Sequence, residues 1–257
     1  MGAAAVTELA RLGAEVHVID LREPPPGATG YFKTDLLDPD AVAQTVDAIG
    51  GEIDALFNCA GRPGIKFPDL EVMTVNFLAA KHLADLVVPR MPRGGAIVTI
   101  SSGAGAGWIS NLAKWMPLAT SDGFDSGLDW LKEHPDEIEG GYAPSKEAII
   151  VWTLWAATAL AEKGIRINCT SPGPTQTPMM PEFEETVGKE FMERYPIPVG
   201  HRSSPEEQAY PLIFLNSRAA SFITGENLNV DGGTMGGIMT GCVDLTELLA
   251  SRTAQAD

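Results

Sequence analysis

Apolar residues recur along the chain in two alternating patterns, one typical of amphipathic helices and one typical of buried strands. The first helical pattern covers residues 1–13, and a run rich in β-branched residues at 14–21 predicts the strand that follows it. This alternation continues through most of the chain, with an irregular stretch between residues 102 and 141. Further strands are predicted at 31–34, 53–59, 96–101, 165–171 and 228–230, and further helices at 39–49, 70–88, 142–162, 181–194 and 205–216.

Strands separated by helices need crossover connections, which favour a mostly parallel sheet covered by helices on both faces. The sequence therefore predicts an α/β fold with a doubly wound, Rossmann-type sheet. The 257 residues suit one domain spanning 1–257, because no linker or low-complexity run divides them. In such a sheet the ligand cleft lies beyond the carboxyl ends of the strands, so the residues after each strand should carry the chemistry.

A tyrosine and a lysine stand one helical turn apart at the start of the predicted helix 142–162. The i, i+4 spacing of Tyr142 and Lys146 puts both side chains on the same helix face. A free tyrosine ionises near pH ~10, and a neighbouring ammonium favours the phenolate, so the pair can pass a proton nearer neutral pH. Tyr142 is therefore a candidate general acid or base, although the same spacing is also common on ordinary solvated helix faces.

Short polar and glycine-containing motifs follow the predicted strands in a fixed order. They are Asp20, Asp35-Leu36, Asn58-Cys59-Ala60-Gly61, Ser101-Ser102, Pro172-Gly173-Pro174-Thr175 and the closing Asp231-Gly232-Gly233. Together with Asn76 and the Tyr142/Lys146 pair, this order resembles the short-chain dehydrogenase/reductase family over essentially the whole chain. The resemblance implies an oxidoreductase in which a hydride moves between a nicotinamide cofactor and the substrate.

The resemblance implies four catalytic residues, Asn76, Ser102, Tyr142 and Lys146. Tyr142 donates a proton to the substrate carbonyl or removes one from the alcohol, while Lys146 lowers the Tyr142 pKa and binds the nicotinamide ribose. Ser102 hydrogen-bonds the substrate oxygen, with Ser101 as its rival because either hydroxyl could face the site. Asn76 either holds a water in a proton relay to the lysine or only satisfies buried backbone groups.

The cofactor contacts implied by the resemblance are distributed over the strand ends. Asp20 accepts hydrogen bonds from the adenosine ribose, and its charge favours NAD(H) over NADP(H), although the nearby Arg22 weakens this preference. Asp35 and Leu36 contact the adenine. The remaining implied contacts are Gly2, Asn58, Ala60, Gly61, Tyr142, Lys146, Pro172 and Gly173, with Thr177 or Thr175 at the nicotinamide carboxamide.

The N-terminus departs from the family pattern. In the family a glycine-rich turn cradles the pyrophosphate between a first strand and the first helix, whereas this chain begins inside that turn, with Gly2 as its last glycine. We therefore expect the sheet to lack its first strand, which would leave two unpaired ladders and expose core. We also expect Met1 to be an internal methionine of a longer reading frame, and the chain beginning there to be impaired in cofactor binding and stability.

An insertion at residues 103–141 separates Ser102 from Tyr142 and resembles the 3α-hydroxysteroid dehydrogenase/carbonyl reductase branch of the family. Its aromatic residues either line a pocket for a flat apolar substrate, or they cap the core or form a subunit contact. A substrate lid is implied at residues 178–200, where methionine and phenylalanine side chains suit a bulky apolar substrate.

These motifs predict an NAD(H)-dependent oxidoreductase that interconverts a secondary alcohol and a ketone, with a steroid or similar hydrophobic compound as substrate. One alternative is a dehydrogenase or reductase of aromatic alcohols or aldehydes. Another is a non-catalytic dinucleotide-binding or scaffold protein, which the incomplete glycine-rich turn would favour. The family resemblance further implies a homodimer or homotetramer.

Composition narrows the expected partners and location. The formal net charge of -16 argues against nucleic acid and anionic membrane surfaces as partners. No run of about 18 apolar residues and no signal-peptide pattern occurs, so a cytoplasmic location is expected. The three cysteines are widely separated and lack metal-ligand spacing, so we expect reduced, mostly buried thiols and neither a disulfide nor a metal site.

Overall fold

The computed structural model describes residues 1–64 and 66–246, and the strands within these ranges pair in parallel. They form two ladders, β1-β2 and β3-β4-β5-β6. The strands are β1 (His17–Asp20), β2 (Gly30–Lys33), β3 (Ala55–Asn58), β4 (Ala96–Ile100), β5 (Arg166–Pro172) and β6 (Asn227–Val230). The predicted α/β fold with parallel strands is therefore confirmed.

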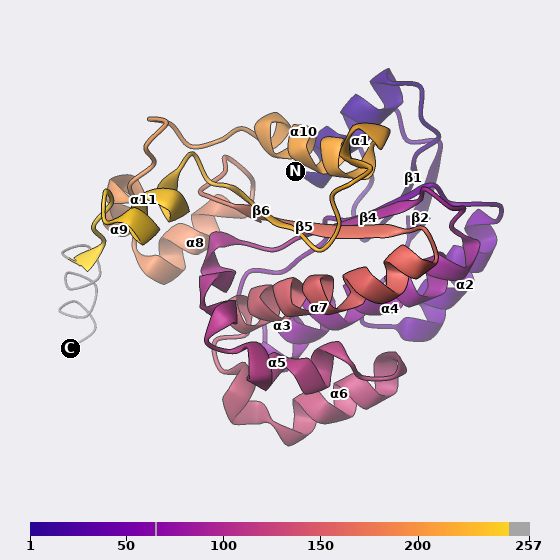
Figure 1. Cartoon of the computed structure of the whole chain (residues 1–257), viewed down its shortest axis with the longest axis horizontal. Coiled ribbons are helices and arrows are strands. Elements are labelled where there is room, and N and C mark those ends of the chain that lie inside the picture. The colour runs from indigo at the N-terminus through magenta and orange to yellow at the C-terminus, as the bar shows by residue number, and fades with distance from the viewer. Residues whose placement is uncertain (65, 247–257) are drawn as a thin grey trace.

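Helices cover both faces of the sheet (Figure 1). α1 and α10 lie together on one face, α4 and α7 lie on the other, and α5 and α6 form a further layer beyond α4 and α7. The helices are α1 (Gly2–Arg11), α2 (Pro39–Ile49), α3 (Asp69–Met73), α4 (Ala79–Val87), α5 (Leu112–Ala119), α6 (Gly123–Glu133), α7 (Tyr142–Glu162), α8 (Met180–Val187), α9 (Lys189–Arg194), α10 (Pro205–Asn216) and α11 (Thr234–Thr240).

Local capping signals explain why two helices begin where the sequence predicts. The Asp38 carboxylate accepts a hydrogen bond from the Ala41 N–H at 2.9 Å at the start of α2. At the start of α10, Ser204 and Glu207 exchange hydrogen bonds between side chain and backbone in a capping box. Both helices also carry proline in the first turn, where its missing N–H costs nothing.

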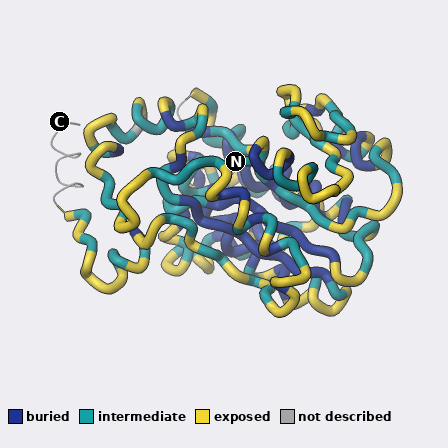
Figure 2. The backbone as a smooth tube through the Cα atoms, turned by 90° about the horizontal axis from the view of Figure 1, so that it is seen from above, coloured by how far each residue is buried: buried dark blue, intermediate teal, exposed yellow. Residues whose placement is uncertain are grey.

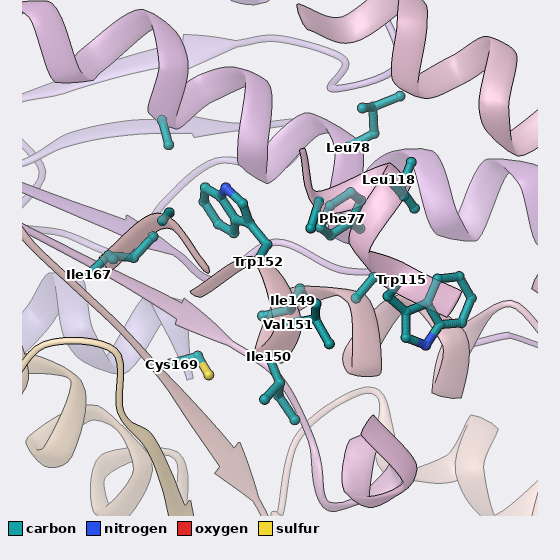
Figure 3. Packing of buried hydrophobic residues seen from close by; sticks show 14 of the residues in the cluster. Phe77, Leu78, Trp115, Leu118, Ile149, Ile150, Val151, Trp152, Ile167 and Cys169 are labelled. Atoms are coloured by element: carbon teal, nitrogen blue, oxygen red, sulfur yellow. The ribbon is translucent and has the colours of Figure 1, made fainter. Parts of the chain in front are cut away.

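The main hydrophobic core surrounds α7, which lies between the β3–β6 ladder and the outer helices. Residues 145–153 of α7 are buried on every side, as expected for a helix enclosed by other elements. Figure 3 shows Trp152 of α7 beside Phe77, and their rings meet edge to face with centroids 6.3 Å apart. Trp115 and Leu118 of α5 belong to the same cluster and are fully buried.

The predicted helix 70–88 is one helical run with an internal π-turn. α3 continues through a π-helix (Thr74–Leu78) into α4 and a final 3-10 turn (Val88–Arg90). The run Asp69–Arg90 is long and apolar enough to cross a membrane by length and composition alone. However, 78% of its apolar window is buried inside the protein, as in a core helix.

The insertion is helical, so the expected irregular stretch is wrong in this part. Glycines at 103, 105 and 107 and Pro117 weaken the local helical signal, and packing against α7 provides the order instead. The aromatic side chains of the insertion pack into or against the main core. Of the alternatives left open by the sequence, the structure thus shows capping of the core.

Two further helical segments differ from the sequence prediction. The predicted helix 181–194 is two helices, α8 and α9, because Gly188 between them adopts a φ of 91°, which a helix does not accommodate. α11 was not predicted. It lies between Gly233 and Gly241, both with positive φ, and its glycine-rich sequence shows no amphipathic period.

The two ladders are not joined to each other. Within the described chain, β1 pairs only with β2 and β3 pairs only with β4, and residues of both β1 and β3 line a cavity of 1110 Å³. Val18 and Ile19 in β1 and Leu56 and Phe57 in β3 are only partly buried, although they are apolar. By contrast, every residue of β4 and β5 is buried, and Figure 2 shows buried backbone, in dark blue, gathered at the centre of the molecule.

We predict that backbone amides of β1 exchange hydrogen at least about tenfold faster than those of β5, because locally weaker regions open at lower free energy. Hydrogen exchange followed by mass spectrometry measures this difference in peptides covering 17–20 and 166–172. Equal protection of the two peptides would show that the β1-β2 ladder is as firmly held as the central strands.

Candidate active site

The first turn of α7 is fastened to the carboxyl end of β4 through a single residue. The Lys146 ammonium donates a hydrogen bond to the Ile100 carbonyl oxygen at 2.9 Å. The Lys146 carbonyl oxygen in turn accepts a hydrogen bond from the Ser101 hydroxyl at 2.8 Å. The side chain and the backbone carbonyl of Lys146 therefore both join α7 to the end of β4. These bonds bring Tyr142 and Ser102 together beside Lys146.

Ser102, rather than Ser101, has its hydroxyl beside the Tyr142 phenol. The Ser102 side chain hydrogen-bonds Tyr142, and its oxygen also accepts a hydrogen bond from the Ala104 N–H at 3.1 Å. Ser101 is almost fully buried and is bonded to the Lys146 backbone. Of the two rival serines, the geometry therefore favours Ser102 for contact with a substrate oxygen.

Burial determines the protonation states of the pair. Burial raises the pKa of Tyr142 above its ordinary value, and the hydrogen bond from Ser102 lowers it in part. Burial also lowers the pKa of Lys146 to about 8. Lys146 is not among the groups that shift the Tyr142 pKa, although its ammonium lies 5.4 Å from the ring centroid and donates a hydrogen bond to Ile100. The phenol thus keeps its proton at neutral pH, which suits a proton donor.

Asn76 lies in the π-turn, and its side chain organises the loop after β3. Its amide oxygen accepts a hydrogen bond from the Arg62 N–H at 2.7 Å, and its amide nitrogen donates to the Arg62 carbonyl oxygen and the Ser145 hydroxyl, both at 3.0 Å. Gly61 lies close to both Asn76 and Lys146, because a Cβ added to it would be 3.3 Å from the Asn76 amide oxygen and 3.9 Å from the Lys146 ammonium nitrogen. The Asn76 side chain thus satisfies buried backbone groups, which is one of the two roles that the sequence left open. The π-turn that carries it is a feature that is frequent at functional sites.

The cavity between β1 and β3 gathers several of the predicted cofactor contacts. Those that line it are Gly2, Asp20, Leu36, Asn58 and Ala60. α1 begins there without a side-chain cap, so N–H groups of its first turn are available to an anion. Further along the cavity Asp20 offers a carboxylate, and it accepts a hydrogen bond from the Arg22 N–H at 2.9 Å. These groups fit a dinucleotide, which needs donors at its phosphates and an acceptor at its ribose.

Asp35 does not join this group. Its side chain is exposed and accepts a hydrogen bond from the Leu37 N–H at 3.0 Å, and it does not line the cavity. This hydrogen bond forms an Asx turn at the end of β2.

The predicted contacts after β5 form a compact turn. Pro172 ends the strand, and Gly173 passes so close to Asp231 that an added Cβ would lie 2.9 Å from its Cα atom. The Thr175 hydroxyl donates to the Gly173 carbonyl and contacts the Ser203 hydroxyl, both at 2.9 Å. Because Thr175 is committed to these bonds, the geometry favours Thr177 as the contact for a nicotinamide.

The segment in which the sequence predicts a substrate lid forms α8 and α9, and α8 contacts Tyr142. The Phe183 ring of α8 meets the Tyr142 ring edge to face, with centroids 5.0 Å apart. Arg202 holds both lid helices, since its guanidinium pairs with Glu184 at 2.9 Å and donates to the Met192 carbonyl at 2.9 Å. Arg202 was not predicted as a site residue, because a single arginine in a loop has no spacing that reveals its partner.

Glu147, a buried glutamate of α7, was likewise not predicted as a site residue. Its signal was present in principle, because it is an acidic residue directly before the apolar run 148–152. The three cysteines are free, and burial raises the pKa of the Cys59 and Cys169 thiols, while Cys242 is exposed. Two of the three thiols are therefore buried, as expected. Among the described residues, no group of three His, Cys, Asp or Glu side chains is placed to hold a metal ion.

Comparison with protein-family models gives two matches along the chain. The model described as short chain dehydrogenase matches residues 1–113, and the model described as enoyl-(acyl carrier protein) reductase matches residues 135–235. Among curated proteins, the chain is 33% identical over 234 residues to a coniferyl-alcohol dehydrogenase of Pseudomonas sp. (strain HR199), with 91% of each chain covered. It is 32% identical over 244 residues to the 3-alpha-hydroxysteroid dehydrogenase/carbonyl reductase of Comamonas testosteroni, again with 91% of each covered.

The fold has a solved counterpart as well. The structure of the 3-alpha-hydroxysteroid dehydrogenase from Pseudomonas sp. B-0831 in complex with NADH superimposes with a TM-score of 0.78 at 30% identity, covering 95% of both chains. The order of strand-end motifs, the Ser102/Tyr142/Lys146 arrangement and these similarities agree over nearly the whole chain. The chain therefore belongs to the short-chain dehydrogenase/reductase family.

Proposed function

We propose that this chain is an NAD(H)-dependent oxidoreductase that interconverts a hydrophobic secondary alcohol and the corresponding ketone. The observation that carries the proposal is the convergence of Ser102, Tyr142 and Lys146 at the carboxyl end of β4, with a protonated phenol beside a serine hydroxyl. A proton donor and a second hydrogen-bond donor aimed at one point suit a carbonyl oxygen that gains negative charge.

Each of the three side chains has a separate task in the proposed reaction. The Tyr142 hydroxyl gives its proton to the carbonyl oxygen during reduction and takes it back during oxidation. Ser102 donates a hydrogen bond to the same oxygen and stabilises its developing charge. Lys146 spends one of its three donors on Ile100 and keeps the others for the ribose hydroxyls. A bound nicotinamide supplies or accepts the hydride.

The charge at the end of β1 supports a preference for NAD(H). The Asp20 carboxylate lines the cavity and would repel a 2′-phosphate, while it is well placed to accept hydrogen bonds from ribose hydroxyls. For Asn76 we propose that the π-turn helps to hold a water of the proton relay, in addition to the side-chain role described above.

A second candidate function is oxidation or reduction of aromatic alcohols and aldehydes. The edge-to-face contact between Phe183 and Tyr142 favours it, because a flat substrate ring can pack against Phe183 while its oxygen reaches the phenol. The similarity to a coniferyl-alcohol dehydrogenase points the same way. Kinetics with NADH on a steroid ketone and on a cinnamyl-type aldehyde, measured side by side, separate the two candidates by their kcat/KM values.

The role of Tyr142 depends on its hydroxyl group. Replacing Tyr142 by phenylalanine (Tyr142→Phe) removes the proton donor and should lower kcat by about 10²–10⁴-fold, with NADH affinity nearly unchanged. Steady-state kinetics and NADH fluorescence titration measure the two effects. The matched control is Tyr210→Phe, since Tyr210 is exposed on α10, and this variant should keep full activity. A Tyr142→Phe variant with normal kcat would contradict the assigned role, and a wild type that binds NADH but turns over no alcohol or ketone would favour a non-catalytic protein.

NADH affinity should fall as the pH rises through about 8, because burial lowers the pKa of Lys146 to about 8. Below this pH the ammonium is charged and donates strong hydrogen bonds to the ribose, and above it the neutral amine does not. Fluorescence titrations on both sides of this pH measure the change. Lys146→Met should bind NADH weakly at every pH. A wild-type affinity for NADH that stays constant across this pH range would contradict the role assigned to Lys146.

The charge of Asp20 bears on which nucleotide binds more tightly. Because the Asp20 carboxylate lines the cavity and would repel a 2′-phosphate, we predict that NADH binds more tightly than NADPH. Fluorescence titration with both nucleotides tests this, and equal affinity for the two would contradict it.

A further inference from the structure

A buried carboxylate follows Lys146 directly in the sequence and joins α7 to the insertion. The Glu147 side chain is among the buried residues of α7, with 8% of the residue exposed. Its Oε2 atom accepts a hydrogen bond from the Trp115 Nε1–H at 2.6 Å and another from the Asn111 side-chain amide at 2.8 Å. Trp115 lies in α5 and Asn111 immediately precedes it. One carboxylate oxygen thus connects the catalytic helix to the start of α5.

The segment between Ser102 and α5 passes over the same two residues of α7 at very short range. A Cβ added to Gly105 would lie 2.9 Å from the Lys146 carbonyl carbon. A Cβ added to Gly107 would lie 2.4 Å from the Glu147 Oε1 atom. The 3-10 helix Gly103–Ile109 is therefore seated against Lys146 and Glu147 as closely as glycine permits.

Ser102 is bonded into the first turn of this 3-10 helix. Its side-chain oxygen accepts a hydrogen bond from the Ala104 N–H at 3.1 Å, and its carbonyl oxygen accepts one from the Gly105 N–H at 2.9 Å. The orientation of the Ser102 hydroxyl therefore depends on where the 3-10 helix lies. That position is set at its far end by Glu147 through Asn111 and Trp115.

We propose that Glu147 is a positioning residue, which holds the Ser102 hydroxyl against the Tyr142 phenol by tying the insertion to the catalytic helix. The proposal rests on the catalytic roles assigned above to Ser102 and Tyr142. Burying a carboxylate is costly unless strong donors satisfy it, and a leucine would fill a similar volume without that cost. Directional hydrogen bonds give the insertion one defined position on α7, which an apolar side chain would not do.

Loss of the tether has a signature that loss of stability alone does not produce. The hydrogen bond from Ser102 is the contact that lowers the Tyr142 pKa, so a displaced Ser102 leaves the phenol with a higher pKa. Lys146 keeps its bond to Ile100, and the cofactor cavity does not include Glu147, so NADH affinity should remain unchanged. Turnover and the Tyr142 pKa should therefore change together while cofactor binding does not.

The test compares Glu147→Leu with Glu147→Gln. The leucine variant removes the acceptor and should lower kcat by about tenfold or more, since small misplacements of catalytic groups are costly. It should also shift the low-pH limb of the alcohol-oxidation profile, where activity rises as Tyr142 loses its proton, to higher pH. The glutamine variant keeps an amide oxygen for both donors and should retain most of the activity and the wild-type pH profile. Glu162→Leu, an exposed glutamate at the end of the same helix, is the matched control and should change neither.

A direct readout keeps the proposal testable without turnover. Ultraviolet titration of the phenolate, taken as the difference between a protein and its Tyr142→Phe counterpart, reports the Tyr142 pKa. Glu147→Leu should raise this pKa relative to wild type, even if no substrate is turned over and the proposed function fails. If Glu147→Leu folds poorly, Asn111→Leu removes one donor and leaves the Trp115 bond, and should give the same shift more weakly. Wild-type kcat and an unchanged Tyr142 pKa in a variant with a lower melting temperature would show that Glu147 serves stability alone.

Discussion

The rest of the site depends on the hydrogen bonds by which Lys146 joins α7 to the end of β4. Its ammonium is bonded to the Ile100 carbonyl and its own carbonyl to the Ser101 hydroxyl, in a place almost closed to water. Burying an ammonium is unfavourable, and the low pKa of about 8 for Lys146 records that cost. In return α7 has one fixed position along the strand, so Tyr142 at its first turn meets Ser102 just beyond the end of β4.

Most of the fold and the central site residues were predictable because they depend on local or topological signals. Capping residues and proline define α2 and α10, and the ends of parallel strands meet at one edge, which places Asp20, Asn58 and Ser102 in order along the site. The helix spacing of Tyr142 and Lys146 was likewise sufficient to pair them.

The remaining features depend on tertiary burial, which the local sequence does not reveal. The Tyr142 pKa rises because surrounding elements exclude water from the phenol. The helices of the insertion are stabilised by packing on α7, although their sequence is rich in glycine and contains a proline. Glu147 resembles an ordinary helical glutamate until the donors from a distant segment are seen.

The molecule has two halves that differ in how far their strands are buried. The catalytic half, made of β4, β5, α5 and α7, encloses a continuous core in which strand residues are fully buried. The half that should receive the dinucleotide is built from the separate β1-β2 ladder and lines a wide cavity. Apart from Lys146, which we assign to both, the groups proposed to bind the cofactor and those proposed to carry the chemical step lie in different parts of the structure.

The central claim is that this site transfers hydride between a nicotinamide and a hydrophobic carbonyl compound. The most direct measurement uses NADH labelled with deuterium at C4, incubated with the protein and either a steroid ketone or an aromatic aldehyde, followed by mass spectrometry of the alcohol product. The account predicts deuterium on the carbon that bears the new hydroxyl group for at least one of these substrates. Tight NADH binding with no transfer of label to either of them would contradict it.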